Sequence, residues 1–298
     1  MEVVKLKAKT KDYLWGGHRL FEYGKEGKDI IAESWELSFF EGMESIIDSG
    51  QEKGRKLCDI STQIDLGSNI KHHKFFPVLI KFIDANKDLS VQVHPSDEYA
   101  LKYENSYGKT EMWYVIDAEK DAKLYIGFNK DVDKDEVTRR INDNTIMDIM
   151  NHVNVKSGDC YFIPSGTLHA IGKGCLIIEI QENSNLTYRV YDYDRRDANG
   201  NPRELHIEKA LKVINFKKTE LNNIKSTILA DNEYFKVTKM VNPKSIKADE
   251  KSFVSLSVLN GEGDINGIKF KKGNTFFIPA NNEAIINGDA EIITTSIN

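Results

Sequence analysis

Four residues of metal-binding type lie on three short segments of the chain. Gln92 and His94 occur in LSVQVHP, Glu111 in GKTEMWYV, and His169 in FIPSGTLHAI. Imidazole nitrogen and carboxylate oxygen are ligands of zinc and similar divalent ions. Alternate side chains of a strand point to the same face, so Gln92 and His94 should project together. The pattern predicts a metal site made of these four residues.

Each of these segments includes an apolar run typical of a strand, which would position the ligand. Glu111 precedes the run 112–116, and His169 follows the run 160–163. A sheet therefore has to bring the ligands together. The other histidines lack this context, and we interpret them as surface or structural residues: His18, His72, His73, His152 and His206.

Composition narrows the class of protein. The 298 residues are 40% hydrophobic and 29% charged, which is typical of a soluble globular chain. A net charge of −5 and the absence of a Lys/Arg cluster argue against nucleic-acid binding. The first residues lack a signal-peptide pattern, and no apolar run reaches membrane-spanning length. Three cysteines without a CxxC pair fit a reducing compartment, so we expect a cytoplasmic protein.

A degenerate repeat divides the chain. Residues 155–164 (VKSGDCYFIP) align without a gap on residues 270–279 (FKKGNTFFIP), at an offset of 115 residues. Both copies read as a polar turn, an apolar strand and a proline, which indicates two similar β modules. The same offset places Ala284 at the position of His169. We therefore expect the second module to be structural and to lack the metal.

Most other segments alternate short apolar runs with turn signals, which favours an all-β sandwich or barrel. The clearest runs are 77–85, 124–128, 175–181, 253–259 and 291–297. Helical patterns appear at 131–153, which would be an insertion in the first module, and at 204–216. We expect a first module over residues 1–220, a linker within 217–228, and a second module over 225–298.

The chain resembles the type I phosphomannose isomerases, which are zinc-dependent bicupin enzymes, in their short bacterial form. The motifs that carry the resemblance are YLWGG (13–17), AESWELS (32–38), PVLIKFIDANKDLSVQVHPSDEYA (77–100), GKTEMWYV (108–115), IPSGTLHAI (163–171) and ENSNLTYRVYDYDR (182–195). The resemblance implies a mainly β fold of two cupin-type (jelly-roll) barrels. It also implies one zinc ion per chain, with Gln92, His94, Glu111 and His169 as ligands.

The resemblance further implies the interconversion of mannose 6-phosphate and fructose 6-phosphate. Such an isomerase moves a proton between C1 and C2 through an enediol-type state, and it needs positive charge near the oxygen that becomes anionic. By motif position, Arg189 matches the family's catalytic arginine, which would stabilise that charge or steer the anionic substrate. Lys109 matches an active-site lysine for substrate contact or proton transfer. Ser90 matches a serine proposed to meet the phosphate.

One residue departs from the family pattern. Asn185 stands where an aspartate is common, so a carboxylate at this position cannot be the general base here. Two alternatives from other classes remain open: a non-catalytic sugar-phosphate sensor, and a metal-dependent bicupin oxygenase. We interpret Arg195 and Arg196 as part of a solvated loop. The expected partner is a small sugar phosphate, with no nucleic acid and no membrane, and the expected state is a monomer or weak homo-oligomer.

Overall fold

The structure is a computed structural model that describes residues 1–196 and 200–298. It is mainly β, as the apolar runs predict, and each of the five runs lies on a strand. Contacts group the chain into two compact units. Unit 1 contains residues 1–84, 178–183 and 224–298, and unit 2 contains residues 85–177 and 184–223. The chain passes between the units four times, and two of these crossings fall inside strands β5 (Val78–Ala85) and β12 (Cys175–Glu182).

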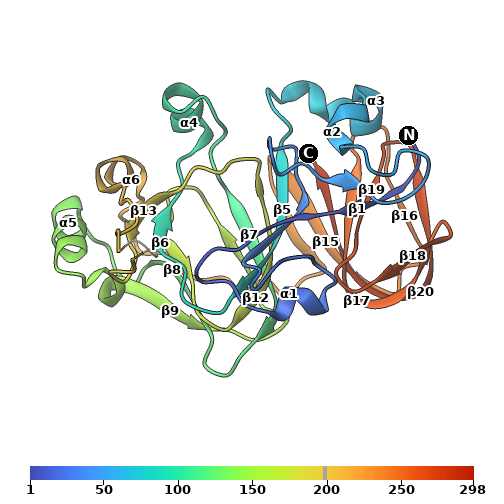
Figure 1. Cartoon of the computed structure of the whole chain (residues 1–298). Coiled ribbons are helices and arrows are strands. Elements are labelled where there is room, and N and C mark those ends of the chain that lie inside the picture. The colour runs from blue at the N-terminus through green and yellow to red at the C-terminus, as the bar shows by residue number, and fades with distance from the viewer. Residues whose placement is uncertain (197–199) are drawn as a thin grey trace. The chain divides into compact units, whose positions relative to one another are not determined.

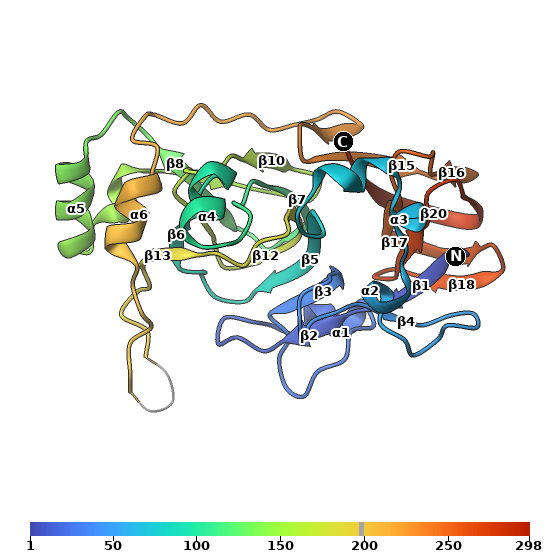
Figure 2. The ribbon, with the colours of Figure 1, turned by 90° about the horizontal axis from the view of Figure 1, so that it is seen from above.

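Unit 1 is built on a nine-stranded sheet with the order β14-β15-β20-β17-β19-β1-β4, in which β16 also pairs with β20 and β18 with β17. Figure 1 labels most of these strands, including β1, β15, β17 and β20. In the same unit β2 pairs with β3, and β3 pairs with β5 (Figure 2). The strands of unit 1 are β1 (Val4–Lys7), β2 (Lys9–Lys11), β3 (Glu33–Leu37), β4 (Ile46–Ile47), β14 (Ile228–Asp231), β15 (Phe235–Val241), β16 (Ser245–Lys247), β17 (Val254–Ile265), β18 (Ile268–Lys271), β19 (Thr275–Ile278) and β20 (Glu283–Ile297). Its short helices are α1 (Arg19–Glu22), α2 (Leu57–Ile60), α3 (Gln63–Leu66) and the 3-10 helix η1 (Ser68–His72).

Unit 2 is built on a five-stranded sheet with the order β13-β6-β11-β8-β9, so β13 is an edge strand. A further antiparallel pair joins β7 and β10. The strands of unit 2 are β6 (Val91–Val93), β7 (Glu111–Ala118), β8 (Lys123–Phe128), β9 (Met150–Asn154), β10 (Cys160–Ile163), β11 (His169–Ile171) and β13 (Tyr188–Tyr191). Its helices are α4 (Asp97–Tyr103), α5 (Lys134–Asn142), the 3-10 helix η2 (Ile146–Ile149) and α6 (Ile207–Val213).

Helices α5 and α6 lie side by side against one face of the five-stranded sheet (Figure 2). Val137 and Ile141 of α5 are one turn apart and share a buried cluster with Ala210 of α6 and with apolar residues of the strands. This packing covers one face of the sheet and leaves the opposite face of β6, β11 and β13 for polar side chains, because strand side chains alternate between faces.

The helical pattern expected over 131–153 is correct for only part of its length. Helix α5 begins after Asp133, whose side chain accepts a hydrogen bond from Glu136 N at 2.7 Å, and it ends at Asn142. Asn144 has a positive φ of 56°, which the helix cannot continue through. The last four residues of the pattern belong to β9 instead, because Met150 and its neighbours pair with β8. The pattern over 204–216 is a helix only at Ile207–Val213.

The expected linker is held in place over its first half. Thr219 N donates to Phe128 O at 2.9 Å, and Asn151 Nδ2 donates to Thr219 O at 3.3 Å. Asn223 accepts from Cys160 N at 3.1 Å through its side chain. Residues 217–223 therefore belong to unit 2, and the division between the units falls after Asn223.

The degenerate repeat recurs in the backbone. Gly158 and Gly273 have φ values of 86° and 84°, a conformation that favours glycine, and each ends the turn before a strand, β10 or β19. The next strand after β10 opens at His169, and the next after β19 opens one residue before Ala284. The two copies thus share their turn, their first strand and the start of their second.

Pairing extends the correspondence beyond the aligned residues. His169 pairs with Gln92, and Ala284 pairs with Ile246, so Ile246 occupies the position of Gln92. His94 follows Gln92 by two residues, and Ala248 follows Ile246 by two residues, so Ala248 takes the position of His94. Ile163 pairs with Glu111 in the first copy, whereas Ile278 pairs with Val254 in the second, so Val254 stands where Glu111 does. All four ligand positions of the second copy are therefore apolar, and they share one hydrophobic cluster: Ile246, Ala248, Val254 and Ala284.

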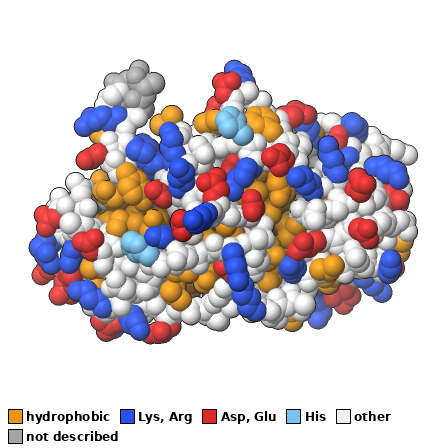
Figure 3. Space-filling view, turned by 90° about the horizontal axis from the view of Figure 1, so that it is seen from below, with side chains coloured by type: hydrophobic (Ala, Val, Ile, Leu, Met, Phe, Trp, Pro, Cys, Tyr) orange, Lys and Arg blue, Asp and Glu red, His pale blue; other side chains and the backbone are white. Residues whose placement is uncertain are grey.

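Charged side chains of both signs lie on the surface (Figure 3), as expected for a chain with a net charge of −5. On the face drawn in Figure 3, acidic and basic side chains are interspersed rather than gathered by sign. Among residues 1–196 and 200–298, no helix combines the length and apolar character needed to cross a membrane.

Candidate metal centre

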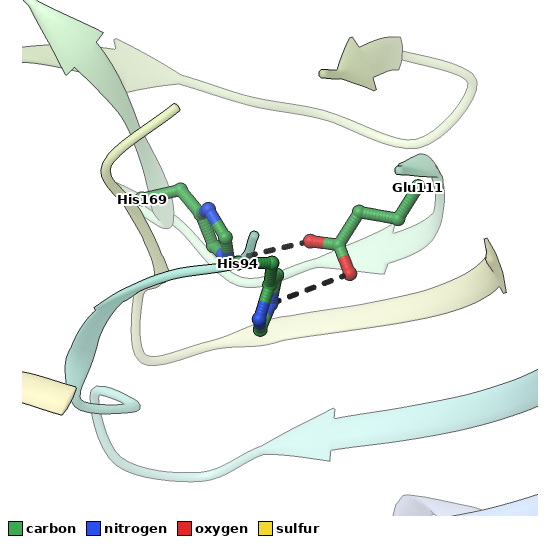
Figure 4. Close-up of side chains that lie close together, drawn as sticks. All are labelled: His94, Glu111 and His169. Carbon is green, nitrogen blue, oxygen red and sulfur yellow. Dashed lines mark ion pairs between the residues drawn. The ribbon is translucent and has the colours of Figure 1, made fainter. Parts of the chain in front are cut away.

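Three of the four predicted metal ligands meet inside unit 2 (Figure 4). His94 Nε2 lies 3.8 Å from Glu111 Oε2, and His169 Nε2 lies 3.3 Å from Glu111 Oε1. Tetrahedral zinc with ligands at about 2.0 Å needs neighbouring donor atoms about 3.3 Å apart. The separations fit a divalent ion of this size. All three side chains are at most 1% exposed.

Backbone carbonyls select the ring nitrogen that each histidine offers. His94 Nδ1 lies 2.6 Å from Leu186 O, and His169 Nδ1 lies 2.8 Å from Thr167 O. A carbonyl can only accept, so each Nδ1 carries the proton and donates. In the neutral form of either ring the lone pair is therefore on Nε2, the atom that lies near Glu111, and a histidine ligand of a metal is commonly held this way.

Gln92 joins the same group through strand pairing. It sits opposite His169 in the β6–β11 ladder, and its side-chain amide nitrogen lies 3.5 Å from His169 Nε2. The ring of Trp113 on β7 also packs edge-on against the ring of His169, at a centroid distance of 5.3 Å. The structure thus brings all four predicted ligands together on β6, β7, β11 and the residue that follows β6.

Lys109 adds a cation to this centre. Its Nζ lies 2.8 Å from Glu111 Oε2, and the residue is 4% exposed. Its backbone N–H donates to Pro95 O at 3.0 Å, which fixes the chain just before β7. The lysine predicted from the sequence therefore contacts a predicted metal ligand directly.

Arg189 and Ser90 lie together further along the same sheet. Arg189 pairs with Gln92 in the β13–β6 ladder, and its Nε donates to Ser90 Oγ at 3.1 Å. The guanidinium thus extends along β6 toward Ser90. Burial lowers the pKa of Arg189 from its ordinary value, and the charge of Arg203 lowers it further. An arginine still remains protonated at neutral pH.

Two further arginines, Arg195 and Arg203, lie close enough to Arg189 for their charges to act on it. Arg195 is not simply part of a solvated loop, because its guanidinium pairs with Asp192 Oδ1 and also donates to Asp88 O at 2.5 Å. Arg203 Nη1 lies 3.6 Å from the same oxygen of Asp192. The sequence motifs do not predict that Arg203 lies near Arg189, because this proximity depends on the path of the chain after β13.

Asn185 is exposed and belongs to unit 2, whose second segment begins at Ser184. The nearby carbonyl of Leu186 is the group that holds His94 Nδ1. The segment in which this chain differs from the family pattern therefore also orients His94, a predicted metal ligand.

Comparisons with known proteins point to the same family as the sequence motifs. Residues 3–142 match the family model for the phosphomannose isomerase type I catalytic domain, and residues 225–297 match the model for the mannose-6-phosphate isomerase cupin domain. Mannose-6-phosphate isomerase ManA of Bacillus subtilis is 37% identical, with 96% of each chain covered. A mannose-6-phosphate isomerase of Streptococcus mutans is 36% identical, with 98% of each chain covered.

A solved structure shows the same fold over the whole length. The crystal structure of the mannose 6-phosphate isomerase from Bacillus subtilis superposes with a TM-score of 0.87 at 32% identity and covers 99% of each chain. The resemblance inferred from the motifs is thereby confirmed. The chain belongs to the type I phosphomannose isomerase family.

Proposed function

We propose that the protein is a zinc-dependent isomerase that interconverts mannose 6-phosphate and fructose 6-phosphate. The observation that carries this proposal is the cluster of His94, Glu111 and His169 with Lys109 at 2.8 Å from the carboxylate. Family membership supplies the reaction and the substrate. We assign one zinc ion per chain to Gln92, His94, Glu111 and His169.

The donor set suits charge that develops on a sugar oxygen. One carboxylate, two neutral imidazoles and one amide would leave a divalent ion with net positive charge. When bound, zinc supplies Lewis-acid polarisation of substrate oxygens. Burial of the protein ligands strengthens this electrostatic effect, because little water is present to screen it.

Arg189 is proposed to stabilise the charge that develops in the enediol-type state or to steer the anionic substrate, and Ser90 is proposed to meet the phosphate. Ser90 lies two residues before Gln92 on the same strand face, which corresponds to about 7 Å along β6. That spacing matches the separation between the reacting end of a hexose and its C6 phosphate. Arg195 and Arg203 add positive potential nearby.

Lys109 is proposed to contact the reacting end and to take part in proton transfer. Its ammonium already lies against Glu111, so it would stand beside any ion held there. Asn185 carries an amide and cannot act as a carboxylate base. Proton movement between C1 and C2 therefore has to use other groups of unit 2, of which Lys109 is the candidate in contact with the metal ligands.

We propose that the remaining architecture follows the bicupin pattern. The first cupin module would cover residues 1–220 with a helical insertion near 131–153, and the second would cover 225–298 without a metal. The apolar residues at all four ligand positions of the second copy support this division of roles. A cytoplasmic monomer or weak homo-oligomer is part of the same proposal.

A coupled assay tests the function directly. Purified protein should form fructose 6-phosphate from mannose 6-phosphate, lose activity with a chelator, and recover with zinc. A protein that binds mannose 6-phosphate without turnover would instead be a sensor, the alternative that Asn185 favours. Activity that depends on iron and oxygen would indicate an oxygenase.

A further inference from the structure

Arg189 lies on an edge strand, yet its backbone groups are hydrogen-bonded on the open side. Among residues 1–196 and 200–298, β6 is the one strand that pairs with β13 in the sheet of unit 2. On the other side, the backbone N–H of Arg189 donates to His206 Nδ1 at 3.2 Å, and the backbone N–H of His206 donates to Arg189 O at 2.7 Å. His206 therefore satisfies both backbone groups that a neighbouring strand would otherwise satisfy.

The same segment holds the side chain of Arg189. Arg189 Nη1 donates to Glu204 O at 2.8 Å, while its Nε donates to Ser90 Oγ at 3.1 Å. The guanidinium is thus fixed from two directions, by β6 and by the segment 204–206. An arginine has several rotatable bonds, so these contacts remove conformations that would misplace its charge.

The acceptor role of His206 requires a neutral ring. Burial lowers the pKa of His206 from its ordinary value, and the charges of Arg189 and Lys209 lower it further. Glu204 and Glu104 act in the opposite direction, with Glu204 Oε2 3.8 Å from His206 Nε2. Tyr188 packs beside the ring at a centroid distance of 6.3 Å. Because Nδ1 accepts from Arg189, the proton of the neutral ring resides on Nε2.

We propose that His206 is a positioning residue for Arg189, which it holds in place by completing the edge of β13 with its neutral ring. The proposal rests on the proposed function, because Arg189 is assigned to the substrate there. His206 itself contacts no substrate in this scheme. A displacement of about 1 Å in a group that meets substrate can cost about 10²-fold in rate.

The first test compares two substitutions of His206 in the zinc-loaded full-length enzyme. His206→Ala removes the acceptor and should lower kcat/KM by about 10- to 100-fold. His206→Asn offers a side-chain oxygen close to the position of Nδ1 and should recover most of that loss. His152→Ala is the matched control, since His152 contacts Met147 O through its ring on β9 and has no contact with Arg189. Zinc content should stay at the parent value in all three variants.

A double-mutant cycle separates positioning from general structural support. In an Arg189→Ala background, adding His206→Ala should lower kcat/KM by less than about threefold, because the group that His206 positions is already gone. An equal loss in both backgrounds would overturn the proposal, as would an inactive His206→Asn variant or an unaffected His206→Ala variant of an active parent. A parent enzyme without isomerase activity would instead overturn the proposed function, and the inference with it.

Discussion

At the scale of single residues, backbone carbonyls orient the two histidines of the proposed metal centre. Leu186 O and Thr167 O each accept a hydrogen bond from Nδ1 of one ring, and both Nε2 atoms lie near Glu111. A ligand fixed in this way loses little conformational entropy when the metal arrives. The centre should therefore bind a divalent ion tightly with little rearrangement.

The first prediction concerns metal content. His169→Ala should remove one nitrogen donor and reduce bound zinc after dialysis to well below one per chain, with activity falling in parallel. His94→Ala should behave in the same way, and His152→Ala should match the parent. Elemental analysis of the dialysed proteins measures the effect. Full activity in a metal-free parent would contradict the zinc assignment.

The second prediction concerns the role of Arg189. If it acts on charge that develops in the transition state, Arg189→Ala should lower kcat more than it raises KM, by about 10² to 10³ for one lost electrostatic donor. Arg189→Lys should recover little, because an ammonium cannot reproduce the contacts to Ser90 and Glu204 O together. Steady-state kinetics provides both constants. A steep rise in KM with kcat nearly intact would restrict Arg189 to phosphate binding.

Residue types and the two-residue period of strands were enough to predict that the proposed metal ligands lie close together. Gln92 and His94 share a strand face, and Glu111 and His169 each begin a strand. The role of His206 could not be predicted in this way. Its contact with Arg189 joins two residues that are 17 positions apart in the sequence, and no periodic pattern encodes that pairing.

At the scale of elements, the sequence determined which segments are strands better than where the helices end. The apolar runs required burial and therefore pairing. The pattern over 131–153 contains apolar residues at helical spacing throughout, yet Met150 belongs to β9 because its pairing with Phe128 offsets the local preference. Local spacing alone did not contain this information.

The third prediction concerns an ion-pair cluster that ties three segments of unit 1. Glu44 Oε1 lies 2.7 Å from Lys56 Nζ, and Glu44 Oε2 lies 3.2 Å from Lys9 Nζ on β2. The hydrogen bond from Lys56 is the main cause that lowers the pKa of Glu44 to about 2. A lowered folded pKa means that the charged form stabilises the fold above about pH 4.5 and that this contribution is lost as the pH falls toward 2.

Glu44→Gln should therefore lower the free energy of unfolding at neutral pH. It should also reduce the loss of stability between about pH 4.5 and pH 2, because the variant has no such proton to bind. Urea unfolding at several pH values measures this difference. Glu41→Gln is the matched control on the same loop, with an exposed side chain. Parallel pH profiles for the parent and Glu44→Gln would contradict the assignment.

At the scale of the whole molecule, one β pattern occurs twice with different interiors. In the first copy the inward positions carry Gln92, His94, Glu111 and His169, which suit an ion. In the second copy the corresponding positions carry Ile246, Ala248, Val254 and Ala284, which suit an apolar core. The sequence offset identified only Ala284, because the other three correspondences depend on strand pairing.

The fourth prediction follows from that apolar interior. A chain with both Glu111→Ala and His169→Ala should bind no zinc, since the second copy offers no donor at any equivalent position. Ala284→His should not add a second ion, and it should lower the free energy of unfolding by about 1 to 3 kcal/mol, because a polar ring would be buried among Ile246 and its neighbours. An ordered ion in the second copy would contradict the correspondence.

The last prediction concerns what the C-terminal segment does for the rest of unit 1. β1 forms part of the nine-stranded sheet by pairing with β19, and Val4 and Leu6 of β1 are only 6% and 5% exposed. Deleting residues 224–298 would leave β1 without β19 and would expose these side chains, each worth about 1.5 to 3 kcal/mol when buried. An unpaired apolar strand is also a template for aggregation. We therefore expect the chain 1–223 to be insoluble or aggregated on size-exclusion chromatography, although it retains every proposed zinc ligand. A soluble 1–223 chain with a cooperative unfolding transition would show instead that the first module folds on its own.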